Sequence, residues 1–253
     1  MSSFYLFLKN YDTIILGDIM IILLILISFL PVFLLGLYIY KKDTEKEPKS
    51  LLLGLFASGV LSAIIVVVVN VFMAILLPQF YLSNTSNKYS FYMLFILIFI
   101  EVALLEEFIK WCMTVFLGYK NKEFDQIYDI VVYAVFVALG FAAFENIFYV
   151  FEGGLTTGLY RAIFSVPGHV SFGVFMGYYL GLAKINEKRN IKKHNKYMFL
   201  SVIVPALLHT IYNFCLMTEN IYFVFMFIGF IIILYVSSIL KVDKVSNEKI
   251  TLE

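Results

Sequence analysis

Seven long apolar runs constrain this chain more than any other feature of its sequence. They lie at about residues 14–40, 51–77, 91–117, 128–150, 161–183, 197–217 and 221–240. About 20 apolar residues in a helix cross a hydrocarbon core of about 30 Å, and each run meets that length. The runs are too long for membrane strands and lack the alternation of a barrel. The sequence therefore predicts an all-α, polytopic membrane helix bundle of about seven transmembrane helices.

The amino-acid composition is typical of an integral membrane protein. Hydrophobic residues make up 62% and charged residues 15%, whereas soluble proteins have about 25% charged residues. The net charge is +1, so no overall field would attract nucleic acid. No repeat or separate soluble domain is visible, and we expect residues 1–253 to form a single integral membrane domain.

The distribution of Lys and Arg predicts the orientation of the helices. With seven crossings, one side of the membrane receives fifteen cations and the other side three. The three are Lys9, Lys88 and Arg161, and the fifteen lie in 41–49, 120–122, 184–196 and 241–249. Cytoplasmic loops are enriched in Lys and Arg, which places the N-terminus outside and the C-terminus in the cytoplasm.

Polar residues interrupt the apolar runs, and ten of them are candidates for a functional site. A charged side chain at the bilayer centre costs about 2.5–3.5 kcal/mol on insertion scales, so such residues must face one another, the bundle interior or water. A functional polar site is therefore the default hypothesis. The ten are Glu101, Glu106, Glu107, Lys110, Asp129, Glu145, Asn146, His169, His209 and Asn213.

The segment EEFIK places three of these groups on one helix face. Lys110 is four residues after Glu106 and three after Glu107, so its ammonium can reach either carboxylate. One carboxylate can then be paired while its neighbour is left for acid–base chemistry. The alternative is a neutralised ion pair that only holds helices together.

Two further segments bring imidazoles into the spans. His209 and Asn213 in HTIYN share a helix face, and a pair of interhelical hydrogen bonds is the alternative to a functional role. His169 shares a face with Gly173, Gly177 and Gly181, a stripe of small residues that lets another helix approach closely.

The remaining polar residues differ in how strongly the sequence supports a functional role. In FAAFEN, Glu145 follows Phe141 by one turn. Asp129 begins the same run, where an acid favours the first turn of a helix. Glu101 lies about 140° round the helix from Glu106 and is the weakest candidate. At about 1.5 Å per residue, Glu106, Glu145 and the two histidines converge between the outer surface and the midplane.

Two classes of function fit intramembrane Glu, Lys and His. One is a hydrolase that activates water, and the other is a proton- or cation-coupled transporter with a charge relay. Transporters often have paired halves with broken helices, but all the polar residues here fall between 101 and 213. The chain contains no HExxH, GxSxG or GxGD motif and no phosphate-binding loop.

The order of the motifs resembles the PrsW family of intramembrane proteases, distant relatives of the CAAX prenyl endopeptidases. The matching segments are EExxK at 106–110, FxxxEN at 141–146, His169 on the next helix, and HxxxN at 209–213. The resemblance implies a multi-pass peptidase of the bacterial cell membrane. It would make the first cut in a membrane-spanning anti-sigma factor, which releases an extracytoplasmic-function sigma factor under stress. Residues 91–217 would form the catalytic core, and helices 1, 2 and 7 would be peripheral.

Two chemistries remain open for such a site. In one, a carboxylate of Glu106 or Glu107 acts as a general base, and His169, His209 and Asn213 position water and stabilise an oxyanion. In the other, a Zn²⁺ ion activates the water. The expected catalytic residues are Glu106, Glu107, Lys110, Glu145, His169, His209 and Asn213, and the candidate metal ligands are Glu106, Glu145, His169 and His209.

The charge distribution makes the topology testable. Reporter fusions at residues 45 and 190 should read as cytoplasmic, and fusions at residues 85 and 155 as external, because the basic loops stay inside. If fusions at 85 and 190 report the same side, the arrangement of seven spans is wrong.

Overall fold

The computed structural model describes residues 2–76, 90–218 and 220–247, with side chains from residue 18 onward. Every regular element in these ranges is helical, which confirms the all-α class. The elements are α1 (Ser2–Lys42), α2 (Lys49–Leu76), α3 (Phe91–Leu97), η2 (Ile98–Leu104), α4 (Leu105–Thr114), η3 (Val115–Tyr119), α5 (Ile127–Tyr160), η4 (Arg161–Ser165), α6 (Val166–Asn186), α7 (Ile191–Met217) and α8 (Ile221–Asn247). Lys88, Lys249 and the side chain of Lys9 lie outside the described residues.

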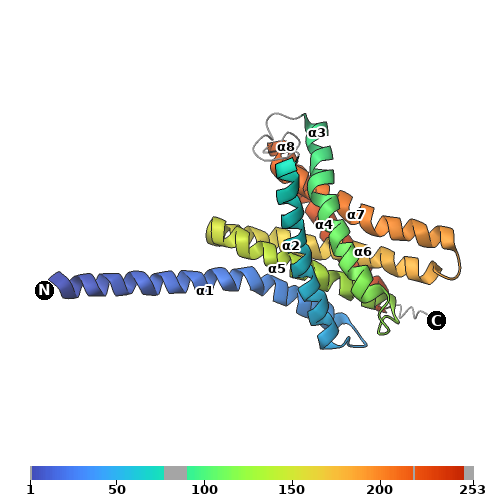
Figure 1. Ribbon diagram of the computed structural model, residues 1–253, viewed down its shortest axis with the longest axis horizontal. Helices are drawn as coiled ribbons and strands as arrows, with labels where there is room; N and C mark the ends of the chain where they lie inside the picture. The colour runs from blue at the N-terminus through green and yellow to red at the C-terminus, as the bar shows by residue number, and fades with distance from the viewer. Residues whose placement is uncertain (1, 77–89, 219, 248–253) are drawn as a thin grey trace.

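Five stretches of the described chain are long and apolar enough to cross a membrane. They are 18–42, 49–76, 127–186, 191–217 and 221–247. The third stretch bends at Gly154, whose φ of 72° is not helical, a backbone conformation that favours glycine. Beyond this bend, α6 returns alongside α5 (Figure 1). The α3–α4 rod, which holds EEFIK, is not among the five.

The glycine stripe on α6 lies against the first half of α5. A Cβ atom added at Gly177 would lie 2.5 Å from the Cα atom of Val131, and one at Gly173 would lie 3.0 Å from the carbonyl oxygen of Ala134. Because glycine has no side chain, the two backbones approach closely along this stripe. The expected close packing on the His169 face is confirmed.

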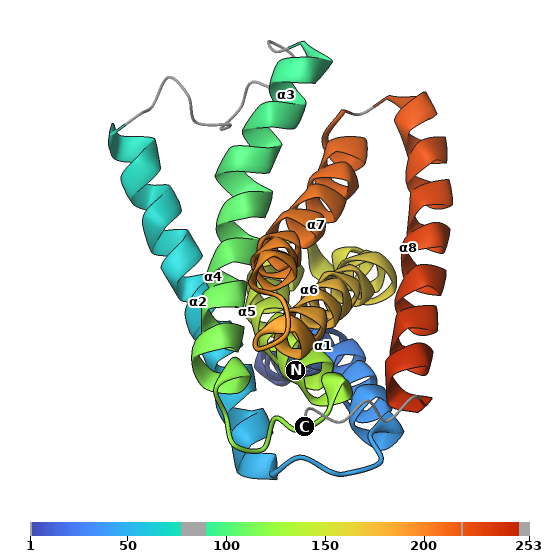
Figure 2. The same cartoon turned by 90° about the vertical axis from the view of Figure 1, so that its right-hand side faces the viewer.

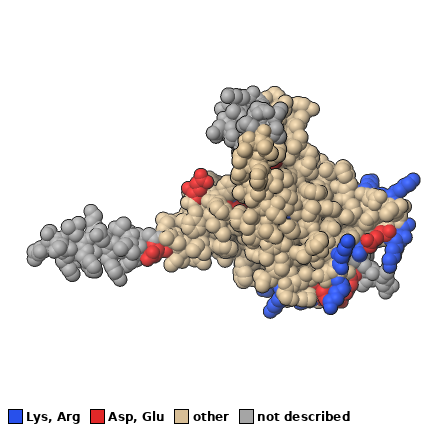
Figure 3. Space-filling model, in the orientation of Figure 1, with Lys and Arg blue, Asp and Glu red and all other residues tan. Residues whose placement is uncertain are grey.

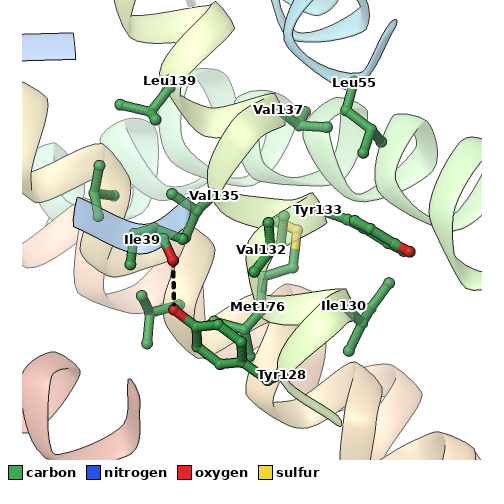
Figure 4. Close-up of a cluster of buried hydrophobic side chains, with 14 of the residues drawn as sticks. Ile39, Leu55, Tyr128, Ile130, Val132, Tyr133, Val135, Val137, Leu139 and Met176 are labelled. Atoms are coloured by element: carbon green, nitrogen blue, oxygen red, sulfur yellow. Dashed lines mark hydrogen bonds between the residues drawn. The ribbon is translucent and has the colours of Figure 1, made fainter. Parts of the chain in front are cut away.

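Helix α5 occupies the centre of the molecule. Figure 2 shows α5 and α6 surrounded by α2, α4, α7 and α8. In the α5–α6 stretch, 89% of the most apolar window is buried, against 22% in α2 and in α8. A helix that is apolar all round is a central helix, whereas the outer helices turn apolar side chains toward lipid. Figure 4 shows this core, in which the hydroxyl of Tyr128 donates to the carbonyl oxygen of Ile39 at 2.9 Å.

Helix ends that are far apart in sequence meet at one end of the bundle. Lys42 at the end of α1 pairs with Asp243 near the end of α8. The hydroxyl of Tyr133 on α5 donates to Glu47 in the α1–α2 loop at 2.7 Å. Lys184 near the end of α6 lies 4.7 Å from the ring centroid of Tyr119.

The opposite end of the bundle is closed by aromatic residues. Phe91 at the start of α3 meets Phe214 of α7 and Phe223 of α8 edge to face, at centroid distances of 6.3 Å and 5.3 Å. Together, the contacts place the end of α1, the start of α2 and the end of α8 at one end of the bundle, and the end of α7 and the starts of α3 and α8 at the other.

The contact between α5 and α6 can be tested at Gly177. Gly177→Ala should lower the melting temperature in detergent, because overpacking a tight contact costs about 1–3 kcal/mol. Gly54→Ala is the matched control, since a Cβ atom there meets nothing within 4 Å. An unchanged melting temperature for Gly177→Ala would contradict the close approach of the two helices.

Candidate active site

Helix α4 presents two carboxylates and one ammonium on a single buried face. The Nζ atom of Lys110 lies 2.6 Å from Oε1 of Glu107 and 3.8 Å from Oε2 of Glu106. Glu106 is 6% exposed, and Glu107 and Lys110 are each 1% exposed. The expected i,i+3 and i,i+4 pairing is confirmed, and the ammonium lies closer to Glu107.

A π-helical stretch precedes this face. Ile98–Leu104 has π-helical hydrogen bonding, and such segments are frequent at functional sites. Glu101 lies within this stretch and is half-buried. The angle of about 140° between Glu101 and Glu106 assumed regular α-helical turns, so the expected place of Glu101 off the site face stays a prediction.

His169 on α6 and His209 on α7 lie next to each other and next to the charged groups of α4. The Nδ1 atom of His209 on α7 lies 3.0 Å from Oε1 of Glu107. The Nδ1 atom of His169 on α6 lies 3.5 Å from Nζ of Lys110. The centroids of the two imidazole rings are 5.4 Å apart. Three helices thus bring together the groups that the sequence placed at similar depth.

Glu145 joins the site from α5 through His169. Its Oε2 atom lies 3.0 Å from Nε2 of His169 and 2.9 Å from Nη2 of Arg161. The Nε atom of Arg161 also donates to Oδ1 of Asn146 at 2.6 Å. The Asn146 carboxamide in turn donates to the carbonyl oxygen of Ser28 in α1 at 2.9 Å.

Arg161 is a site residue that the sequence analysis missed. It was counted only as one of three cations on the outer side. Its position at the first residue of the apolar run 161–183 was the available signal, because a cation in a membrane span has a partner more often than not.

Aromatic rings cover the polar groups. Nζ of Lys110 lies 4.2 Å from the ring centroid of Phe141, and the ring of Phe172 stacks on that of His209 at 4.8 Å. A cation on an aromatic face gains electrostatic attraction, and the rings keep water away from the ion pair. The phenylalanine of FAAFEN is therefore part of the site wall.

Two of the ten polar residues, Asp129 and Asn213, form no hydrogen bond with the charged groups of α4 in the described part of the chain. The carboxylate of Asp129 accepts hydrogen bonds from the backbone N–H groups of Asp125 at 3.0 Å and Gln126 at 2.6 Å, which confirms its role as a helix cap. Asn213 is half-buried one turn after His209. Among the described residues, none forms a hydrogen bond with the Asn213 carboxamide.

The site contains a group of residues that fits a divalent metal. Glu106, Glu107 and His169 offer ligand atoms that all lie within 4.8 Å of one another. The Oε2 atom of Glu106 is buried without a hydrogen-bond partner, and such an oxygen is costly unless it gains a partner. Carboxylate oxygens and an imidazole nitrogen are ligands that Zn²⁺ accepts.

This group differs from the ligand set expected from the sequence. It includes Glu107, whereas Glu145 and His209 are outside it. The guanidinium of Arg161 pairs with Glu145 and offsets its charge.

Comparison with known proteins identifies the family. The family model described as "PrsW family intramembrane metalloprotease" matches residues 47–238. The chain belongs to the PrsW family. All four motif segments that resembled the family lie inside the matched range.

Curated relatives agree over most of the chain. A protein named "Protease PrsW" from Oceanobacillus iheyensis is 36% identical over 214 residues, 84% of this chain and 91% of the relative. "Protease PrsW" of Clostridioides difficile is 34% identical over 88% of this chain and 92% of its own length, and that of Bacillus subtilis is 34% identical over 77% and 84%. No solved structure matches.

Family membership establishes the class of the protein. It is an intramembrane peptidase, and it resides in the bacterial cell membrane as a multi-pass protein. The transporter alternative is not favoured. The buried Glu–Lys–His cluster is accordingly the candidate active site of a peptidase.

The pairing of Lys110 with Glu107 generates a prediction about yield and activity. Lys110→Met should lower the folded yield or the activity, because removing one partner of a buried pair costs about 3–5 kcal/mol. Lys110→Arg should preserve part of both. Lys122→Met is the matched control, since the Lys122 side chain is 91% exposed. Equal yield and activity in wild type and Lys110→Met would remove this role.

Proposed function

We propose that this peptidase makes the first cut in a membrane-spanning anti-sigma factor and so releases an extracytoplasmic-function sigma factor under envelope stress. The observation that supports a hydrolytic site is the buried meeting of two adjacent carboxylates with two imidazoles. The nature of the substrate follows from the resemblance to the family. A site between the midplane and the outer surface suits a cut on the extracytoplasmic flank of a substrate helix.

We further propose seven crossings, with the N-terminus outside and the C-terminus in the cytoplasm. Residues 127–186 form a hairpin, whose first limb precedes the bend at Gly154 and whose second limb follows it. The count adds the α3–α4 rod and this second limb to the five apolar stretches. In Figure 3, the Lys and Arg side chains in view lie at the right and along the lower edge, whereas the upper and left parts of the described surface have none. The positive-inside rule assigns that basic end to the cytoplasm. Residues 1–253 then form one membrane domain with its catalytic core at about 91–217.

In the proposed mechanism, Glu106 is the general base. Glu107 already accepts from Lys110 at 2.6 Å and from His209 at 3.0 Å. The Oε2 atom of Glu106 has no hydrogen-bond partner, so it is the carboxylate oxygen that can take a proton from water. Glu107 and Lys110 then form the pair that holds the base in place.

The histidines and Asn213 are proposed to orient water and to stabilise the oxyanion. A carboxylate can only accept, so Nδ1 of His209 donates to Glu107 and Nε2 is the ring nitrogen left for water or substrate. Stacking on Phe172 fixes the plane of this ring. Asn213, one turn further along α7, could supply an amide donor to the developing oxyanion.

A metal ion is compatible with the same residues. Glu106, Glu107 and His169 would hold it, and His209 and Glu145 lie next to this group. A bound Zn²⁺ would lower the pKa of water to about 7 and polarise the scissile carbonyl. The orientation of the histidines by their carboxylates is the task of this chain with or without the ion.

The proposal is tested by co-expression with a candidate single-pass anti-sigma factor and mass spectrometry of the products. Wild type should produce one cut on the extracytoplasmic flank, and Glu106→Gln, His169→Ala and His209→Ala should abolish it while remaining in the membrane. Glu152→Gln, an exposed glutamate near the end of the same hairpin limb as Glu145, is the matched control and should cut normally. Cleavage that persists in Glu106→Gln would contradict the role of Glu106.

An assay of the purified enzyme separates the metal chemistry from the glutamate-base chemistry. Purified enzyme is assayed in detergent before and after 1,10-phenanthroline, and its metal content is measured in parallel. Loss of cleavage with loss of zinc, restored by added zinc, supports the metal enzyme. Full activity after complete metal removal would exclude the zinc mechanism and support a glutamate general base.

A further inference from the structure

Arg161 has contacts that a cation serving only the topology of the membrane would not need. Its side chain is 13% exposed, and its guanidinium lies 4.4 Å from the ring centroid of Tyr149. Two different nitrogens of the guanidinium donate to Glu145 and Asn146. Long cations near helix ends normally extend toward the interface, whereas this one points into the protein.

We infer that Arg161 is a positioning residue of the peptidase, which acts through Glu145 to hold His169 in the Nε2–H tautomer with its Nδ1 lone pair facing the α4 carboxylates. The inference depends on the proposed function only for its activity measurement. Its other measurement observes the imidazole directly.

The partners of His169 determine this tautomer. The Glu145 carboxylate, paired with the guanidinium of Arg161, accepts hydrogen bonds, so Nε2 of His169 donates across the 3.0 Å contact. The ammonium of Lys110 can only donate, so Nδ1 must accept across the 3.5 Å contact. One neutral tautomer satisfies both neighbours, and in it the Nδ1 lone pair points toward Lys110 and the Glu106–Glu107 pair.

Arg161 supplies what Glu145 needs to play this part. Nη2 of Arg161 donates to Oε2 of Glu145 at 2.9 Å, and Nε of the same guanidinium donates to Oδ1 of Asn146 at 2.6 Å. The rigid guanidinium therefore fixes the position of the carboxylate oxygen that accepts from Nε2 of His169.

The position of Arg161 in the fold explains how it fixes geometry. It lies at the start of η4, after the bend at Gly154, and it joins the second limb of the hairpin to Glu145 and Asn146 on the first limb. His169 follows on the second limb, in α6. One side chain therefore links the register of the two limbs to the orientation of the imidazole.

The test is ¹⁵N NMR of histidine-labelled protein in detergent. The chain has three histidines, and His169→Gln assigns the signal of His169 by its disappearance. Wild type should show His169 with a protonated Nε2 and an unprotonated Nδ1. Arg161→Met should lose this pattern, whereas Arg189→Met, which replaces an exposed loop arginine, should retain it.

A second variant covers the case in which Arg161→Met does not fold. In Glu145→Met, no side-chain oxygen remains to accept from Nε2 of His169, so the fixed Nε2–H pattern should be lost. Retention of the wild-type tautomer in a folded Arg161→Met or Glu145→Met protein overturns the inference. A wild-type signal that is already of the Nδ1–H form overturns it as well.

The activity measurement separates positioning from a structural role. Loss of a residue that orients an active-site histidine typically costs about 10–100-fold in activity. Arg161→Met should lower kcat by that factor with KM within about twofold, and Arg161→Lys should recover part of the loss, because an ammonium keeps the charge without the fork. A lower melting temperature with unchanged kcat in the remaining folded protein would assign Arg161 a purely structural role.

Discussion

The contact between Lys110 and Glu107 is the interaction on which the rest of the site depends. Two adjacent carboxylates within a membrane helix would be costly without a cation beside them. The ammonium at 2.6 Å from Glu107 offsets that cost, and the ring of Phe141 covers its other side at 4.2 Å. With Glu107 paired, Glu106 keeps an oxygen that no hydrogen bond occupies.

The site repeats one arrangement twice. Glu107 orients His209, and Glu145 orients His169, each through a contact of 3.0 Å. Each carboxylate is also paired with a cation, Lys110 in one case and Arg161 in the other. A histidine whose second nitrogen is held by an acceptor has a defined tautomer and ring direction, which general acid–base catalysis and metal binding both require.

The hairpin of α5 and α6 fixes the relative positions of Glu145, Arg161 and His169. Its close packing along the Gly173–Gly177–Gly181 stripe sets the height of His169 relative to Glu145. The bend at Gly154 allows Arg161 to reach back to the first limb. The outer helices α2 and α8 bury 22% of their most apolar windows, although α2 also packs closely on α5, where Gly59 lies against Val137.

The sequence by itself determined the helical class, the pairing within EEFIK, the cap at Asp129 and the glycine contact on α6. These features are local or depend on helical period, and the membrane leaves helices as the means by which such apolar runs satisfy their backbone groups. The family resemblance in 106–213 also came from the order of motifs. Only the tertiary structure decided that Lys110 lies closest to Glu107, that Arg161 joins Glu145, and that Glu107 rather than Glu145 belongs to the candidate metal group. Those outcomes depend on which helix faces meet and on the π-helical turns before Glu106, and residue spacing along one helix contains no information about its neighbours.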